Sequence, residues 1–255
     1  SVNMPLYKLL GGPVRDKVVC YPHTYGDNIE QLIDSCKRHV DDGWKFVRWH
    51  QPETGSAGYG YNLDSDTGME FNVLEPVESI KIAEEQIALI RDAIGPDIQI
   101  CFDVHTRLDT AHAITLCRAV EKFRPFFMED PLRSENPASY RTISRHVSVP
   151  IAAGEQWASK WPFREVIEEE LINYARIDLC IVGGLTEALK ITHWSETHYI
   201  DIVPHNPLGP VSAAACVSLC RASSNVGVQE MPRRPGSYAT DLFPVQIEWD
   251  DGYAW

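Results

Sequence analysis

Acidic and histidine side chains recur along this 255-residue chain at intervals of 23 to 27 residues. Each follows a short apolar run that is rich in β-forming residues, and together they are Asp103, Glu129, Glu155, Asp178, His205 and Glu230. The interval is the length of one strand plus one helix. It predicts that all six side chains lie on one rim of a barrel of parallel strands, where catalytic residues of such barrels lie.

Three of these residues, Asp103, Glu129 and Glu155, are carboxylates on consecutive strand ends. Three converging anions would repel one another at low dielectric unless a cation lies between them. Carboxylate oxygens suit a hard divalent cation, and Mg²⁺ commonly binds one or two carboxylates together with substrate oxygens. The sequence therefore predicts a Mg²⁺ site. The alternative is three unrelated, exposed acids with separate partners.

Asp178 and His205 follow the next two predicted strands. A carboxylate beside an imidazole selects its tautomer and raises its basicity, as in many general bases. We therefore predict that His205 is a base oriented by Asp178. The alternative is a structural histidine with its hydrogen bonds satisfied.

His105 comes two residues after Asp103, and strand alternation predicts that both side chains point to the same side. His105 would then face a bound carboxylate substrate from the side opposite His205. Two such histidines suit removal of a proton by one and protonation of a leaving hydroxyl by the other. A plain hydrogen-bonding role in a loop is the alternative.

The elements that must position these residues alternate between strand and helix patterns. Strands are predicted at 18–21, 45–50, 98–104, 126–129, 150–153, 175–179, 200–203 and 226–229. Helix-length segments between them include 28–40, 78–94, 110–123, 161–170, 185–196 and 211–221. Eight strands with seven helices predict an α/β fold, a (β/α)7β TIM-like barrel, in preference to an open doubly wound sheet. Residues 51–76 interrupt this pattern with a glycine-rich stretch, interpreted as an active-site loop or a simple insertion.

Composition excludes several classes of protein. A hydrophobic share of 44% argues against disorder, and no apolar run is long enough to span a membrane. The net charge of −13 argues against a nucleic-acid partner. Seven scattered cysteines without a CxxC pair are typical of buried, reduced thiols, so we predict a cytoplasmic protein.

Five short motifs together resemble the enolase superfamily, and within it the acid-sugar dehydratases of the mandelate racemase branch. They are Phe-Asp-Val-His at 102–105, Phe-Met-Glu-Asp-Pro at 127–131, Ala-Ala-Gly-Glu-Gln at 152–156, Arg-Ile-Asp at 176–178 and His-Asn-Pro-Leu-Gly-Pro at 205–210. Residues 5–12 resemble the segment where that family enters its barrel. The resemblance implies one catalytic barrel over residues 1–255, without the N-terminal capping domain and the C-terminal tail of the family.

The resemblance also implies roles for single residues. Asp103, Glu129 and Glu155 match the Mg²⁺ ligands of the family, while Asp178 and His205 match its base dyad. His105 matches the extra histidine that galactonate- and mannonate-type dehydratases use as an acid. The remaining matches concern substrate binding: Glu230 on the last strand, Arg48 in place of a Lys-x-Lys lysine, His50, and Tyr59 or Tyr61 as the tyrosine that partners Arg48 in mannonate dehydratases.

The function that this resemblance implies is a Mg²⁺-dependent lyase acting on a galactonate-, mannonate- or gluconate-like sugar acid. It would abstract the C2 proton and eliminate the C3 hydroxyl to give a 2-keto-3-deoxy acid. A racemase or epimerase of the same superfamily is the nearer alternative, and a non-catalytic metal-binding barrel is the remoter one. The family also implies a homo-oligomer.

Overall fold

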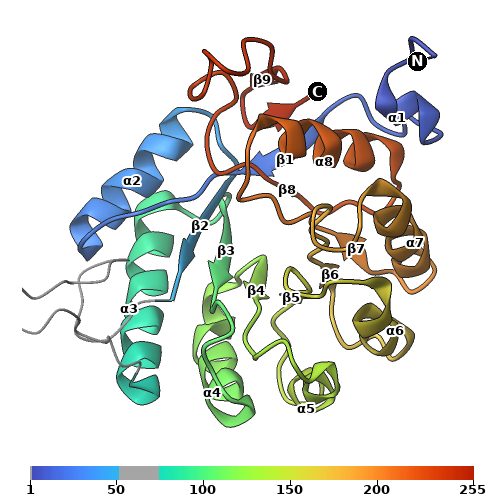
Figure 1. Cartoon of the computed structure of the whole chain (residues 1–255). Coiled ribbons are helices and arrows are strands. Elements are labelled where there is room, and N and C mark those ends of the chain that lie inside the picture. Colours follow the sequence, from blue (N-terminus) through green and yellow to red (C-terminus); the bar gives the residue numbers. More distant parts are fainter. Residues whose placement is uncertain (1, 52–74) are drawn as a thin grey trace, which may run out of the picture.

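Parallel strands close into a barrel in the computed structural model, which describes residues 2–51 and 75–255. Six of them form one parallel sheet in chain order: β2 (Phe46–His50), β3 (Gln99–Asp103), β4 (Phe127–Glu129), β5 (Ile151–Ala153), β6 (Tyr174–Ala175) and β7 (Asp201–Ile202). β1 (Val18–Tyr21) pairs in parallel with β8 (Gln229–Glu230). A parallel bridge between Ile202 and Val226 joins β7 to the β8 segment. The Thr24 amide donates to the Arg48 carbonyl at 2.8 Å, which joins β1 to β2. The predicted TIM-like barrel is therefore confirmed (Figure 1).

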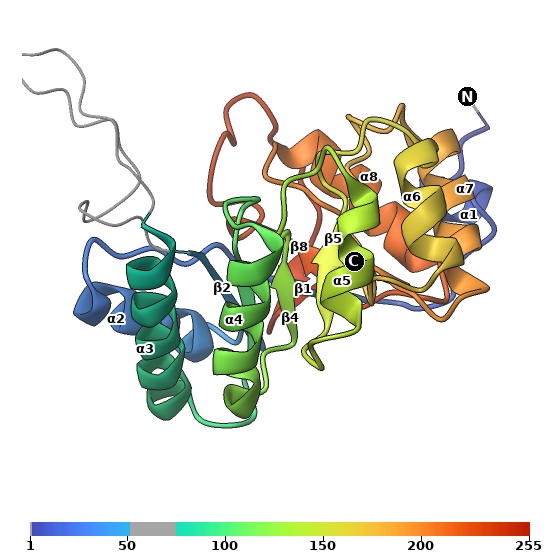
Figure 2. The same cartoon turned by 90° about the horizontal axis from the view of Figure 1, so that it is seen from below.

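Helices surround the barrel on its outside, as Figure 1 shows. They are α2 (Ile29–Asp41), α3 (Pro76–Ile94), α4 (Thr110–Val120), α5 (Tyr140–Ser144), α6 (Lys160–Glu168), α7 (Leu185–Glu196) and α8 (Pro210–Ala222), with the short α1 (Leu6–Leu9) before β1. Two 3-10 turns, η1 (Glu121–Phe123) and η2 (Pro137–Ser139), follow α4 and precede α5. Seen from below in Figure 2, α2, α3 and α4 stand side by side along one flank. Each helix is expected to cover the apolar outer face of neighbouring strands.

Three features differ from the sequence-based expectation. The strands predicted at 175–179 and 226–229 are short, because regular pairing covers only β6 and β8. Helix α5 was not among the helix segments predicted from the sequence. A third feature is an antiparallel ladder in which β9 (Trp249–Asp250) pairs with β10 (Tyr253–Ala254) and β10 pairs with β1.

Alternation along the strands separates two layers of side chains. Phe127 belongs to an inner apolar cluster, whereas Met128 packs into the large cluster between sheet and helices. Glu129 then points inward again, because successive strand residues alternate between faces. The inner cluster forms a floor of Tyr21, Phe46, Cys101, Phe127, Ala152, Val203 and Val228. The catalytic candidates lie one layer above this floor.

Two predictions from composition can be compared with the structure. Six of the seven cysteines are buried free thiols, and Cys180 is a free thiol on the surface. Over residues 2–51 and 75–255, none of the helices combines the length and apolarity that a membrane crossing requires.

Candidate active site

The three predicted metal ligands lie in the buried layer above the apolar floor. Asp103 and Glu129 are the last residues of β3 and β4 and are direct partners in the parallel register. Glu155 follows β5 after Gly154, whose φ of 129° is one that residues with a side chain rarely adopt. Both Asp103 and Glu129 are completely buried, and Glu155 is nearly so.

Two buried arginines bind these carboxylates. Arg48 on β2 donates from Nη2 to Asp103 Oδ2 at 2.6 Å and lies 3.6 Å from Glu129 Oε2 through Nε. Arg176, one residue after β6, reaches three carboxylates through Nη2: Glu129 at 2.5 Å, Glu230 at 2.8 Å and Glu155 at 3.5 Å. No role was predicted for Arg176. Its position two residues before Asp178, in strand alternation, was the available signal.

The donor set fits a hard divalent cation. Glu129, Asp130 and Glu155 can each offer an oxygen, and these oxygens lie within 4.8 Å of one another. Asp130 Oδ2 is buried and has no hydrogen-bond partner among the described residues, whereas the two oxygens of Glu129 lie near Arg176 and Arg48. Carboxylates this close together and this deeply buried are costly unless positive charge lies among them. Asp130 was not predicted, although it follows Glu129 directly.

Asp103 belongs to a second group of possible metal ligands, together with His50 and His105. Ligand atoms of His50, Asp103 and His105 also lie within 4.8 Å of one another. The backbone amide of His105 donates to Asp103 Oδ1 at 2.7 Å, and His50 Nδ1 lies 3.3 Å from Oδ2. Glu129 and Glu155 therefore lie in one group. Asp103 is the register partner of Glu129, but the oxygens of Asp103 contact Arg48, His50 and the backbone of His105.

Burial, followed by the charges of the neighbouring acids and arginines, governs how these acids titrate. Burial, with the neighbouring charges of Asp130 and Glu129, raises the pKa of Glu155 to about 11. Burial and Glu129 raise the pKa of Asp103 to about 7, against the opposing effect of Arg48. Burial also acts on Glu129, but Arg176 and Arg48 outweigh it and lower its pKa. A bound cation would favour the ionised form of all three groups.

The predicted dyad is present as a direct hydrogen bond. His205 Nδ1 donates to Asp178 Oδ2 at 2.7 Å, and the two residues form an isolated parallel bridge between the β6 and β7 segments. The other Asp178 oxygen accepts from the backbone amides of Cys180 and Ile181. Burial opposes ionisation of Asp178, but the bonds from His205 and Ile181 outweigh it and lower its pKa. His205 Nε2 lies 3.5 Å from Glu155 Oε2 and so faces the carboxylate cluster.

His105 reaches the site by a route that strand alternation does not describe. β3 ends at Asp103, and His105 has a φ of 56°, in the left-handed region. Its ring still lies on the side of Asp103, with its centroid 5.1 Å from that of His50. His105 and Asp103 therefore lie close together through a turn and not through strand alternation. Burial and the charges of Arg107 and Arg48 lower the pKa of His105.

Glu230 lies at the centre of a second network. Its Oε2 accepts from Arg176 and from the Asn206 backbone amide at 2.7 Å. Its Oε1 accepts from His23 Nε2 at 2.6 Å, and His23 Nδ1 accepts from the Tyr25 hydroxyl at 2.8 Å. His23 was not predicted as a site residue. Like His205, it comes just after a predicted strand, and that position could have identified it.

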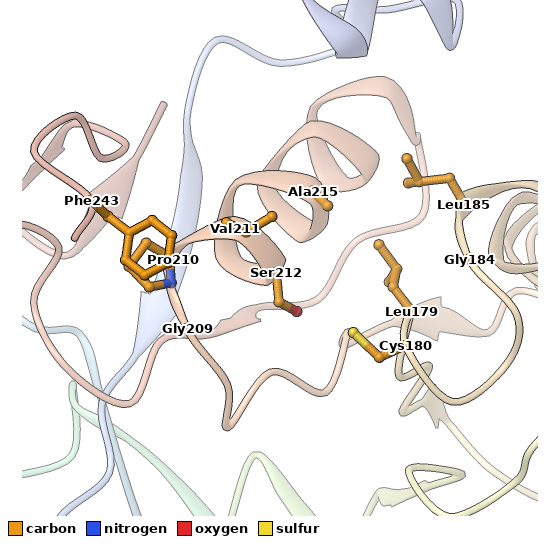
Figure 3. A pocket seen from close by; sticks show the side chains of 10 residues that line it. All are labelled: Leu179, Cys180, Gly184, Leu185, Gly209, Pro210, Val211, Ser212, Ala215 and Phe243. Atoms are coloured by element: carbon orange, nitrogen blue, oxygen red, sulfur yellow. The ribbon is translucent and has the colours of Figure 1, made fainter. Parts of the chain in front are cut away.

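Two cavities adjoin this layer. A cleft of about 790 Å³ includes His23, Tyr25 and His50 in its lining. A smaller apolar cavity of about 470 Å³ lies between the loops that lead into α7 and α8, and Figure 3 shows its side chains, with Leu179 and Phe243 among them. The predicted loop at 51–76, including Tyr59 and Tyr61, falls almost wholly outside the described residues.

Comparisons with known proteins show the family of this chain. Residues 31–255 match the model of the family described as enolase C-terminal domain-like. A D-mannonate dehydratase of Caulobacter sp. (strain K31) is 33% identical over 98% of this chain. A D-galactonate dehydratase family member of Marinomonas sp. (strain MWYL1) is 34% identical over the same share. The chain spans 64% and 65% of the length of these two relatives.

The fold comparison includes an enolase of Pantoea ananatis whose crystal structure holds D-gluconate and Mg. It superposes with a TM-score of 0.88 at 27% identity, covering 99% of this chain and 65% of that protein.

Proposed function

The chain belongs to the enolase C-terminal domain-like family, and from this premise we propose that it is a Mg²⁺-dependent sugar-acid dehydratase. The observation that carries the proposal is the His205–Asp178 dyad, whose free ring nitrogen lies 3.5 Å from Glu155 in the carboxylate cluster. The names of the mannonate and galactonate dehydratases and the gluconate-bound neighbour support the substrate class.

The carboxylates of Asp103, Glu129 and Glu155 are the residues we propose to hold Mg²⁺. When bound, the ion supplies positive charge that stabilises the substrate carboxylate as negative charge develops on proton removal. Arg48 and Arg176 hold the carboxylates in place through the contacts given above. Asp130 lies beside Glu129 and adds to the negative charge of the cluster.

His205 is the proposed general base. Its Nδ1 proton is bonded to Asp178, so the Nε2 lone pair is free to accept the C2 proton of the substrate. The imidazolium that results is stabilised by the ionised Asp178, whose pKa is lowered by the hydrogen bond from His205 and those from the backbone against the effect of burial. Proton removal at C2 leaves an electron pair that is first delocalised into the substrate carboxylate and then forms the C2–C3 double bond.

His105 is the proposed general acid. As that double bond forms, the C3–O bond breaks, and His105 donates a proton so that the hydroxyl leaves as water. The nearby charges of Arg107 and Arg48 add to burial in lowering its pKa, which makes the protonated ring a stronger acid. The enol then takes up a proton at C3 and loses the proton of its C2 hydroxyl, so that the C2–C3 double bond is replaced by the C2 carbonyl of the 2-keto-3-deoxy acid. We assign Arg48, His50 and Glu230 to substrate binding at the same rim.

The test is a screen of aldonic and aldaric acids with the full-length protein and Mg²⁺, read by detection of 2-keto-3-deoxy acids. We expect one configuration to be dehydrated and the activity to be lost when a chelator is added. The same library incubated in D2O reports exchange at C2. Exchange without loss of water would indicate an epimerase or racemase. Absence of both reactions, with Mg²⁺ bound, would favour a non-catalytic metal-binding barrel.

A further inference from the structure

One cleft is lined both by histidines that contact the buried carboxylates and by a pair of arginines. The lining of this space of about 790 Å³ includes His23, which contacts Glu230 at 2.6 Å, and His50, which lies 3.3 Å from Asp103. Arg233 and Arg234, which follow β8, line the same space. A molecule bound at the carboxylate cluster through one end can therefore extend toward these two guanidinium groups.

The two arginines are a positive site in an acidic protein. Both side chains are exposed, and each lies over an aromatic ring: Arg233 over Tyr238 at 5.4 Å and Arg234 over Trp249 at 5.0 Å. In the described part of the chain, neither guanidinium is paired with a carboxylate. In a chain with 36 acidic residues and a net charge of −13, two adjacent arginines without acidic partners form a local site that attracts anions.

The segment that carries them is held by its own hydrogen bonds. The Gln246 side chain accepts from the Gly236 amide at 2.9 Å and donates to the Tyr238 carbonyl at 2.9 Å. The Tyr238 hydroxyl donates to the Leu208 carbonyl at 3.2 Å, which ties the segment to the loop after β7. Arg233 is thus positioned at the cleft by a folded loop.

Tyr25 is a further residue of the cleft lining. Its hydroxyl donates to His23, which is bonded to Glu230. Burial raises the pKa of Tyr25, and the charges of Arg48, Glu230 and Arg233 also act on it. Tyr25 is therefore within electrostatic range of both the carboxylate cluster and Arg233.

We propose that Arg233 and Arg234 bind a second anionic group at the distal end of the substrate, so that the preferred sugar acid is a dianion in the sense that it has an anionic group at each end. The proposal rests on the proposed function for the end of the substrate that reacts. A guanidinium can form paired hydrogen bonds to a carboxylate or to a phosphate, so the shared chemistry is a terminal oxyanion.

The experiment compares matched substrates with the full-length protein and Mg²⁺. For each of the manno, galacto and gluco configurations, the aldonic acid is compared with the aldaric acid and with the aldonic acid 6-phosphate. We expect kcat/KM for one of the two dianions to exceed that of the matched monoanion at least tenfold. Preference for the aldaric acid assigns a carboxylate, and preference for the 6-phosphate assigns a phosphate ester. Equal or better use of the monoanion in every configuration would overturn the proposal.

The variant R233Q/R234Q isolates the subsite. We expect at least a tenfold loss of kcat/KM for the dianion and less than a twofold change for the monoanion. Arg164→Gln on α6 is a control that removes a positive charge from an exposed arginine, which is paired there with Glu168. It should leave both substrates unchanged. Equal losses for monoanion and dianion in R233Q/R234Q would also overturn the proposal.

Calorimetric titration separates this proposal from the proposed function. If no compound is turned over, the proposed function fails, and the Kd values of the same compounds with Mg²⁺ decide the subsite. Dianions that bind at least tenfold more tightly than monoanions, with a difference that R233Q/R234Q abolishes, would support the subsite alone. Monoanion turnover without any dianion preference would support the proposed function alone.

Discussion

The two flanks of the barrel rim use the same residue types in different ways. On the flank formed by β2 and β3, Asp103 binds Arg48, and the nearby His105 has cationic neighbours that act on its ring. On the flank formed by β6 and β7, Asp178 binds the imidazole of His205 directly. A carboxylate fixes the tautomer and the orientation of the imidazole bonded to it, whereas cations beside an imidazole lower its pKa. This difference supports the proposal that the base and the acid lie on opposite flanks.

Removing the base tests this comparison most strongly. We expect His205→Asn to lower kcat by about 10³-fold, within the usual range for loss of a general base. Exchange of the C2 hydrogen with solvent should be lost together with dehydration, while Mg²⁺ affinity stays nearly unchanged. His146→Asn, at an exposed site after α5, is the matched control. Wild-type turnover by His205→Asn would falsify the base assignment.

Removing the acid should separate two steps that His205→Asn abolishes together. We expect His105→Asn to lower dehydration by about 10²-fold, again from loss of acid–base catalysis. C2 exchange in D2O should continue near the wild-type rate, because His205 and Asp178 are intact. Product formation and deuterium incorporation are measured on one sample. If exchange falls as far as dehydration, His105 acts in proton removal, and the two flanks do not have the separate roles we assign.

The smallest expected effect concerns stability, and it distinguishes the two aspartates. The pKa of Asp103 is raised to about 7, so the folded protein keeps a proton that the unfolded chain loses near pH 4. Without metal, this stabilising contribution is complete below pH 4 and is lost as pH rises toward 7. The pKa of Asp178 is lowered, so its contribution is already present above pH 4 and is lost only at more acidic pH.

Urea unfolding between pH 5 and 8 measures this difference. In chelator, we expect stability to fall with rising pH, less steeply in Asp103→Asn and with the wild-type slope in Asp178→Asn. Mg²⁺ at a hundred times its Kd should add about 2.7 kcal/mol to the free energy of unfolding. The Mg²⁺ concentration required should be lower at pH 8 than at pH 5, since bound metal favours ionised carboxylates. A Kd for Mg²⁺ that is the same at pH 5 and pH 8 would contradict the raised pKa of Asp103.

Local sequence was sufficient for the barrel and for the order of its rim residues. Strand and helix patterns depend on neighbouring side chains, and their regular interval carries each acid or histidine to the same end of the sheet. This is why the pairing of Asp178 with His205 could be predicted, although these residues are 27 positions apart. Boundaries were less predictable, since regular pairing covers only two residues in each of β6 and β8.

Tertiary structure alone decided which side chains meet across the closed barrel. His23 and Glu230 are 207 positions apart and come together only because β1 pairs with β8. Arg176 contacts carboxylates from three other strand ends, and no local pattern indicates which of them it reaches. The face to which a side chain points is set by its own strand, whereas the residues that it meets are set by closure of the sheet. The sequence therefore determined the rim and its residue types, and the fold decided their pairing.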